Sequence, residues 1–182
     1  KMVYPFIASE YYNYVRVVDD DDVLIVVSQS GETMDSLKAL RAFRERGAKI
    51  IAVSNVIDSS IPRESDIALY TRAGPEIGVA ATKTFTTQTL LLVMLSIGMG
   101  EMNGSLTRSE AEEYRGIVGS SGEIVSHVLS LNDVYAKELA EWLKDKSSVY
   151  YLSRGIGVPV AMEGALKLKE IAYIHAESYP AG

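Results

Sequence analysis

Two continuous apolar runs on either side of an amphipathic segment constrain the fold more than any other feature of the chain. The runs are Val23–Val27 and Ile50–Val53, and their lack of alternation is typical of parallel strands covered on both faces. The segment between them, Met34–Arg46, places four apolar side chains on one helical face: Met34, Leu37, Leu40 and Phe43. Gly47 follows where a helix C-terminal cap belongs. This βαβ pattern, with its right-handed crossover, predicts an α/β fold with a parallel sheet flanked by helices.

Further strands and a long helix are predicted in the same part of the chain. Val3–Ala8 and Ile67–Tyr70 are short apolar runs that we predict to be strands. A helix is predicted from about Thr82 to Met102, and its second half is almost entirely apolar. We assign residues 1–103 to one domain on this basis.

The remaining sequence has a different character. Residues 104–147 are predicted to be a helical connector, in which Gly119–Gly122 breaks one helix and a second covers roughly 126–146. Residues 148–182 then repeat the strand–helix pattern, starting with the strand Val149–Leu152. We expect this last segment to be the first βα unit of a second domain.

The composition argues against several kinds of function. The formal net charge of −6 disfavours a nucleic-acid ligand, whose affinity rests largely on lysine and arginine. The chain has no cysteine, and His127 and His175 lack the spacing of metal ligands, so we expect no metal and no cofactor. The longest nearly apolar stretch, Leu90–Met99, is too short to span a bilayer, and the first residues lack a signal-peptide layout. We therefore expect a cytoplasmic protein with no membrane partner.

The first candidate site follows the apolar run at 23–27. Its sequence is Ser28-Gln29-Ser30-Gly31-Glu32-Thr33, at the carboxyl end of a predicted parallel strand, where open α/β sheets bind ligands. One interpretation is a simple turn, since serine and glycine are common in turns. The other is an anion site, in which the hydroxyl groups and the next helix's N-terminus bind a phosphate while Glu32 points away. The residues alone leave both interpretations open.

Two further segments carry candidate chemistry. Gly78–Gln88 follows the strand predicted at 67–70, and its threonines either cap the next helix or belong to a ligand site. Glu163, Lys167 and Glu170 are spaced i, i+4 and i+7, so they share one helix face. They form either a solvated, salt-bridged face or a catalytic group in which Glu170 is a general base and Lys167 tunes it.

Together these segments strongly resemble the isomerase region of the glutamine–fructose-6-phosphate transaminase (glucosamine-6-phosphate synthase) family. The resemblance runs through SQSGET, ESDIALYTRAGPEIGVAATKTFTTQ and EGALKLKEIAYIHAESYPAG and covers nearly the whole chain. Short Ser-Gly-Thr loops occur in all sugar-isomerase (SIS) domains, whereas TKTFT and EGALKLKE are more specific to this family. The resemblance implies SIS domains with a flavodoxin-like parallel sheet flanked by helices, and we expect a homodimer.

The resemblance also implies roles for individual residues. Phosphate binding is implied for four residues of the first candidate site: Ser28, Gln29, Ser30 and Thr33. The Val79 backbone and Ala81 are implied at the sugar, although relatives often have serine in place of Ala81. Glu170, assisted by Lys167, is implied to move a proton between C1 and C2 of the open-chain sugar. The implied reaction converts fructose 6-phosphate and glutamine to glucosamine 6-phosphate and glutamate.

Other parts of that family's machinery are not found in this sequence. They are the glutaminase domain with its cysteine, the first strand with its Thr-Ser loop, the ring-opening histidine and the lysine that forms the Schiff base. We therefore expect this chain to be unable to complete the reaction alone. One alternative is a non-catalytic SIS module that senses a phosphosugar and regulates another activity. Another is a helical scaffold that assembles through Leu139 and Trp142.

The missing first strand predicts a gap in the sheet. In a flavodoxin-like order this strand lies between the second and third strands, here Val3–Ile7 and Val23–Val27. An empty position would leave backbone groups without partners, at about 1–3 kcal/mol each. We hypothesise that Val149–Leu152 fills the gap, from the same chain or from a partner by domain swapping. Glu170 need not then reach the first candidate site.

Overall fold

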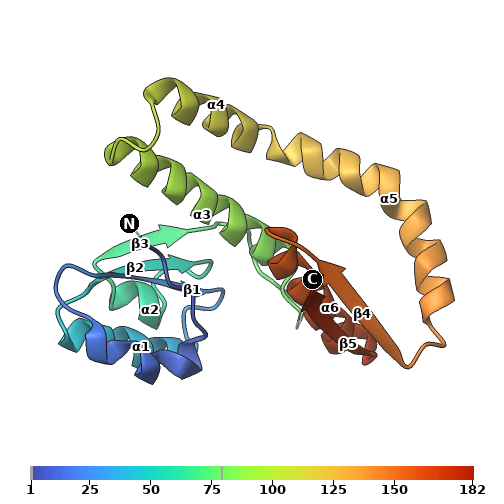
Figure 1. Cartoon of the computed structure of the whole chain (residues 1–182), viewed down its shortest axis with the longest axis horizontal. Coiled ribbons are helices and arrows are strands. Elements are labelled where there is room, and N and C mark those ends of the chain that lie inside the picture. Colours follow the sequence, from blue (N-terminus) through green and yellow to red (C-terminus); the bar gives the residue numbers. More distant parts are fainter. Residues whose placement is uncertain (1, 79) are drawn as a thin grey trace. The chain divides into compact units, whose positions relative to one another are not determined.

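The computed structural model describes residues 2–78 and 80–182, which form two compact units. The first unit comprises residues up to 77 together with 81–107, and the second comprises the remainder of the chain. Each unit has its own parallel sheet (Figure 1). The domain boundaries expected at 103 and 147 stay predictions.

The first unit contains a three-stranded parallel sheet. Its strands lie side by side in sequence order: β1 (Val23–Ser28), β2 (Lys49–Ser54) and β3 (Ile67–Tyr70). Helix α1 (Met34–Glu45) joins β1 to β2, and the short helix α2 (Ser60–Arg63) lies between β2 and β3. The βαβ unit predicted from the sequence is confirmed. Because all three strands run in parallel, their carboxyl ends meet at one edge of the sheet.

One face of this sheet is buried against α1 and α2 (Figure 1). The core is formed by nine side chains: Leu24, Val26, Leu37, Leu40, Phe43, Ala48, Ile50, Ala52 and Ile61. The predicted apolar face of α1 is confirmed at three of its four positions, whereas Met34 is exposed. The expectation that these strands are covered on both faces is wrong for β1, because Val23 and Val27 are exposed.

Helix α3 (Lys83–Met102) lies on the opposite side of the sheet from α1 (Figure 1). It confirms the helix predicted from Thr82 to Met102. Only Thr84 and Ile97 are buried on it. By length and composition alone α3 is long and apolar enough to cross a membrane. The expectation that no segment is long enough was based on Leu90–Met99, which is only part of this helix. A single helix of this kind does not by itself assign a chain to a membrane.

The strand predicted at Val3–Ala8 is not formed. Residues 2–7 have no regular secondary structure, and two short 3₁₀ helices follow, η1 (Ala8–Asn13) and η2 (Val15–Val17). Instead of pairing as a strand, the segment places the ring of Phe6 against Phe43 of α1, with 5.7 Å between ring centroids. An apolar run becomes a strand only beside a neighbour that accepts its backbone hydrogen bonds, and here packing on α1 replaces that pairing.

The second unit consists of three helices and two strands. Its elements are α4 (Arg108–Gly119), α5 (Ser121–Leu143), β4 (Ser148–Ser153), α6 (Gly157–Ala172) and β5 (His175–Pro180). The predicted break at Gly119–Gly122 is confirmed, although α5 begins at 121 rather than near 126. None of the 23 residues of α5 is buried. Strand β5 was not predicted from the sequence.

Strand β4 pairs in parallel with β5, in a register that places Val149 opposite Ala176. Tyr173 ends α6 in a left-handed conformation with φ of 57°, and the chain turns directly into β5. Within the described residues β4 lies in this two-stranded sheet and β1 pairs only with β2. The hypothesis that Val149–Leu152 fills the gap from the same chain is therefore wrong. The alternative with a partner chain stays a prediction.

Candidate functional site

The loop after β1 is organised by its own hydroxyl groups. Ser28, the last residue of β1, is buried, and its Oγ accepts the N–H of Gly31 at 3.1 Å. The same Oγ lies 3.0 Å from Oγ1 of Thr33. The Oγ of Ser30 accepts the N–H of Glu32 at 3.2 Å, which leaves its own O–H as a donor. The loop is therefore a tight turn that also presents hydroxyl groups, and the anion site stays a prediction.

Gly31 is required by a close approach of two loops. Its φ is +68°, in the left-handed region that favours glycine. A Cβ at this position would lie 1.9 Å from Oγ of Ser59, in the loop after β2. The carbonyl of Gly31 accepts the N–H of Ile61 at 2.9 Å. The loop after β1 is thus held directly against the start of α2.

The N-terminus of α1 has no side-chain cap. Thr33 is the N-cap residue, but its hydroxyl is directed to Ser28 and makes no capping hydrogen bond. Its carbonyl accepts the N–H of Leu37 at 3.0 Å, which starts the helix. N–H groups in the first turn of a helix carry a partial positive charge and bind anions when no side chain occupies them.

The carboxylate of Glu32 is bound to Ser60 at the start of α2. It accepts the backbone N–H of Ser60 at 2.8 Å and its hydroxyl at 2.6 Å. These two hydrogen bonds, the hydroxyl first, together with the attraction of Arg63, outweigh burial and hold the pKa of Glu32 below its usual value. Glu32 therefore serves the loop as an anchor to its neighbour.

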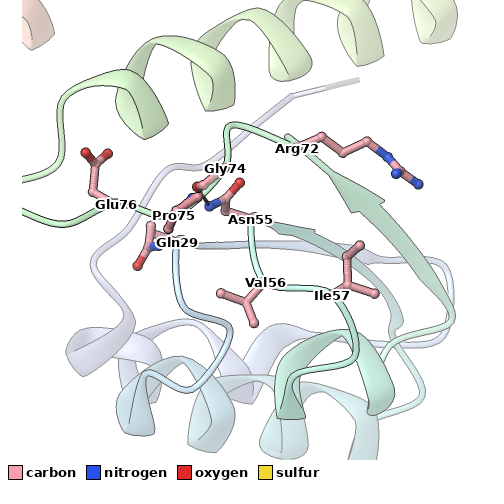
Figure 2. A pocket seen from close by; sticks show the side chains of 8 residues that line it. All are labelled: Gln29, Asn55, Val56, Ile57, Arg72, Gly74, Pro75 and Glu76. Atoms are coloured by element: carbon pink, nitrogen blue, oxygen red, sulfur yellow. Dashed lines mark hydrogen bonds between the residues drawn. The ribbon is translucent and has the colours of Figure 1, made fainter.

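A pocket of about 490 Å³ lies beside this loop, at the carboxyl ends of all three strands (Figure 2). Its lining residues are Gln29, Asn55, Val56, Ile57, Arg72, Gly74, Pro75 and Glu76. Gln29 is the one residue that the pocket shares with the predicted phosphate loop. The pocket thus continues the candidate site from β1 across to the segment that follows β3.

Asn55 joins the three strand ends. Its N–H donates to the carbonyl of Gln29 at 3.1 Å. Its side-chain oxygen accepts the hydroxyl of Thr71 at 2.9 Å and the N–H of Ala73 at 2.8 Å. Its side-chain nitrogen donates to the carbonyl of Gly74 at 2.7 Å, the dashed contact in Figure 2. One amide side chain thereby fixes the floor of the pocket.

The segment after the pocket leads into α3 through Glu76. Its carboxylate accepts hydrogen bonds from Thr82 and Thr84, the shortest from Oγ1 of Thr84 at 2.7 Å. The hydrogen bond from the Thr84 side chain contributes most to holding the pKa of Glu76 below its usual value. Thr82 is the N-cap residue but makes no side-chain capping bond, so the capping role expected for the threonines is not what this residue performs. Ala81 lies just before Thr82, and Val79 lies outside the described residues.

The third candidate group forms as its spacing predicts, on α6 in the second unit. The Lys167 ammonium lies 3.0 Å from the Glu163 carboxylate and 3.1 Å from that of Glu170. Burial alone lowers the pKa of Lys167, but hydrogen bonds and attraction from the two glutamates outweigh it and raise this pKa above its usual value. Lys167 is therefore a cation at neutral pH. Across residues 2–78 and 80–182 no cluster of three or more histidine or acidic side chains could hold a metal ion.

The structure thus brings together part of the predicted set. The four predicted phosphate residues lie in one loop of the first unit, while Glu163, Lys167 and Glu170 share one face of α6 in the other unit. Sequence reasoning missed the roles of Asn55 and Glu76. For Asn55 the available signal was a polar residue directly after β2, since ligand sites collect at strand carboxyl ends. Glu76 lies well beyond the end of β3 at Tyr70 and carried no such signal.

Comparison with known proteins places these features in context. The sequence model described as the SIS domain matches residues 1–98. The glutamine–fructose-6-phosphate aminotransferase [isomerizing] of Pyrobaculum aerophilum is 51% identical over 178 residues, which are 98% of this chain and 29% of that protein. The protein of the same name from Aeropyrum pernix is 49% identical over 179 residues, again 98% of this chain and 29% of the relative. The chain therefore spans less than a third of the length of these relatives.

Solved structures agree with the sequence relatives. The C-terminal domain of glucosamine-fructose-6-phosphate aminotransferase from Francisella tularensis matches with a TM-score of 0.92 and 41% identity, over 96% of this chain and 49% of that chain. A glucosamine-6-phosphate deaminase from Thermotoga maritima has a TM-score of 0.67 at 21% identity, over 96% of this chain and 50% of that chain, and shows the shared fold alone. The predicted α/β fold, with parallel strands flanked by helices, is confirmed.

Proposed function

Because the chain belongs to the SIS domain family, we propose that it is the phosphosugar-binding isomerase region of a glutamine–fructose-6-phosphate aminotransferase. The ligand is fructose 6-phosphate or its product, glucosamine 6-phosphate. In the whole enzyme the reaction converts fructose 6-phosphate and glutamine to glucosamine 6-phosphate and glutamate. The protein acts in the cytoplasm as a homodimer, without nucleic acid, membrane, metal or cofactor.

The observation that carries this proposal is the loop between β1 and α1. The hydroxyl groups of Ser28 and Thr33 meet beside a helix N-terminus that has no side-chain cap, and the one carboxylate in the loop is bound to Ser60. Hydroxyl and backbone N–H donors at such a terminus bind a dianionic phosphate without a lysine or arginine. We assign the phosphate to Ser28, Gln29, Ser30 and Thr33.

The sugar is assigned to the pocket beside that loop and to the following segment. Gln29 belongs to both the loop and the pocket, so a ligand whose phosphate occupies the loop extends naturally toward Asn55 and Gly74. The Val79 backbone and Ala81 are the proposed sugar contacts of the segment that leads to α3. A pocket lined by few, fixed polar groups is typical of small-molecule sites.

Glu170 is the proposed general base, which moves a proton between C1 and C2 of the open-chain sugar. Its carboxylate is held 3.1 Å from the ammonium of Lys167, a cation at neutral pH. Proton transfer of this kind requires a carboxylate within hydrogen-bonding reach of the carbon acid. Lys167 holds the carboxylate in a defined position between transfers.

A non-catalytic SIS module that senses a phosphosugar is the alternative. It is favoured by the geometry of the α6 cluster, because Glu163, Lys167 and Glu170 form the ion pairs that an ordinary solvated helix face would form. The two functions share the phosphate loop and differ in whether Glu170 performs chemistry.

Isothermal titration of the chain with fructose 6-phosphate tests the shared part. We expect the double variant Ser30→Ala/Thr33→Ala to bind at least about tenfold more weakly, a loss of 1.4 kcal/mol or more. Ser105→Ala, an exposed serine in the turn after α3, is the matched control and should bind as the wild type does. Equal affinity of the double variant and the wild type would remove this loop from the site.

Exchange of the sugar's C1 and C2 protons with solvent distinguishes the enzyme function from the sensor function. In D₂O, a chain that moves the proton between C1 and C2 incorporates deuterium into fructose 6-phosphate, which proton NMR detects without any need for glutamine. The enzyme proposal predicts exchange that Glu170→Gln abolishes while binding is retained. A wild-type chain that binds the sugar and catalyses no exchange supports the sensor.

A further inference from the structure

One carboxylate of the first unit joins two parts of the chain that lie on either side of the proposed sugar contacts. Glu76 accepts two hydrogen bonds from Thr84, from its N–H at 3.1 Å and from its hydroxyl at 2.7 Å. It also accepts two longer ones from Thr82, at 3.3 Å from the N–H and 3.4 Å from the hydroxyl. The start of α3, directly after Ala81, is therefore held by the carboxylate of Glu76.

This carboxylate takes the place of a helix cap. The N-cap residue Thr82 makes no side-chain capping bond, although the first N–H groups of a helix need acceptors. Glu76 supplies that acceptor from outside the helix, and its negative charge suits the positive end of the helix dipole. Thr84 is fully buried, so its hydroxyl depends on Glu76 for a partner.

The chain before Glu76 is fixed as well. Asn55 binds the N–H of Ala73 at 2.8 Å and the carbonyl of Gly74 at 2.7 Å. Asn55 is itself attached to the phosphate loop through the carbonyl of Gln29. A continuous set of hydrogen bonds thus runs from the phosphate loop through Asn55 to the residue before Pro75, and Glu76 extends it to the start of α3.

Glu32, the other carboxylate at this edge, acts on a different part of the site. It binds Ser60 and holds the phosphate loop against α2, whereas Glu76 holds the entry to α3. Glu32 therefore supports the part of the edge assigned to the phosphate (the phosphate half), and Glu76 supports the part assigned to the sugar (the sugar half). A change at Glu76 should leave the phosphate half intact.

We propose that Glu76 is a positioning residue that sets the place of Ala81, a proposed sugar contact, by holding Thr82 and the first turn of α3 directly after it. The inference rests on the proposed function, because that function assigns Ala81 to the sugar. Glu76 touches no reacting atom. It acts through Ala81, and its loss changes recognition of the sugar rather than of the phosphate.

The test compares two ligands on the same variants of the whole chain. Glu76→Gln keeps the size of the side chain but removes its charge and one acceptor oxygen. We expect affinity for fructose 6-phosphate, measured by calorimetry, to fall about tenfold, since hydrogen bonds to charged groups are the stronger kind. Affinity for inorganic phosphate, measured by NMR titration, should stay within about twofold of the wild type.

Two further variants make the result specific. Glu45→Gln, an exposed glutamate at the end of α1, changes the net charge equally and should bind both ligands as the wild type does. Thr84→Val removes only the hydroxyl partner and keeps the charge of Glu76. It should weaken fructose 6-phosphate binding in the same direction, and the double variant with Glu76→Gln should lose less than the sum of the two.

Three outcomes would overturn the proposal. If Glu76→Gln binds fructose 6-phosphate as the wild type does, the position of Ala81 does not depend on this carboxylate. If it loses both ligands equally, Glu76 supports the fold and not the sugar half of the site. If the wild-type chain binds neither ligand, the proposed function itself fails and this inference fails with it.

Discussion

The chain contains two strand–loop–helix units that resemble each other in outline and differ in their surroundings. In β1–α1 and in β4–α6, the strand ends in a serine, Ser28 or Ser153, and the loop contains a glycine with positive φ, +68° at Gly31 and +54° at Gly155. Neither helix has a side-chain cap at its N-terminus. From the local sequence alone, both loops could bind an anion.

The loops of the two units differ in the contacts that surround them. A Cβ on Gly31 would collide with Ser59 of the neighbouring loop, whereas a Cβ on Gly155 would meet nothing within 4 Å. The first loop is also attached to α2 through Glu32 and to the loop after β2 through Gln29. The second is joined to Ala181, which donates its N–H to the carbonyl of Ser153 at 2.8 Å. A glycine and a helix N-terminus are thus shared features, and only the first loop is held in place by the loops of adjacent strands.

The largest difference in stability between the two units should appear when one leucine in each is shortened to alanine. Leu40 on α1 is fully buried, while Leu166 on α6 is 41% exposed. We expect Leu40→Ala to cost about 3 kcal/mol of unfolding free energy, and Leu166→Ala about 1 kcal/mol, since the loss depends on burial and on the cavity left behind. Native-state amide exchange, read at β2 and at β4, measures both. Equal losses would contradict the contrast in packing.

Substitution of Gly31 and of Gly155 should give the next largest difference in stability. Gly31→Ala introduces both a strained φ and a collision, and we expect it to cost about 2–3 kcal/mol. Gly155→Ala introduces the strained φ alone, at about 1 kcal/mol. Urea denaturation measures the pair, and calorimetry with fructose 6-phosphate should show that only the first substitution also impairs binding. A tolerated Gly31→Ala would show that the close approach of the two loops is not required.

The attachment of the phosphate loop to α2 should depend on pH. The hydrogen bonds from Ser60 lower the pKa of Glu32 in the folded chain, so its contribution to stability is complete above the unfolded pKa of about 4.3. That contribution is lost as pH falls through the lower, folded pKa. Glu32→Gln should therefore be less stable than the wild type at pH 7, and the difference should shrink as pH falls below about 4. A difference that is constant from pH 7 to pH 3 would contradict this role.

The smallest effect is expected for the ion pairs of α6. The side chain of Lys167 is 21% exposed and bridges two partly exposed glutamates. Lys167→Met should lower the stability of β4 by only about 0.5 kcal/mol, because solvent screens such pairs. If Lys167 positions Glu170 for proton transfer, the same variant should slow deuterium incorporation into fructose 6-phosphate far more than it changes stability. Parallel small changes in both would favour a solvated helix face.

The sequence predicted the elements whose signals are local. Continuous apolar runs identified β1, β2 and β3, and the spacing of Leu37, Leu40 and Phe43 identified α1. The run Val3–Ala8 gave the same signal and was wrong, because a strand also needs a neighbour, which periodicity does not report. Strand β5 was missed for the opposite reason: its sequence His-Ala-Glu-Ser-Tyr-Pro is polar, and only its pairing with β4 makes it a strand.

In the candidate site, too, only the local features could be predicted from the sequence. The hydroxyl-rich loop could be read from the sequence, since its residues are consecutive and follow a strand. The contacts that hold it could not, because Glu32 meets Ser60 and Asn55 meets Gly74 across loops that are brought together only by the parallel sheet. The spacing of Glu163, Lys167 and Glu170 did predict their ion pairs, because helical geometry alone determines which side chains share a face.

We propose above all that the carboxyl edge of β1, β2 and β3 binds a phosphosugar with its phosphate at the start of α1. A crystal structure of the chain soaked with fructose 6-phosphate would reveal where the ligand binds. We expect the phosphate within hydrogen-bonding distance of the Ser30 and Thr33 hydroxyls and the first-turn N–H groups of α1, with the sugar extending from Gln29 toward Asn55 and Gly74. A phosphate bound at any other position, with this loop empty, would contradict it.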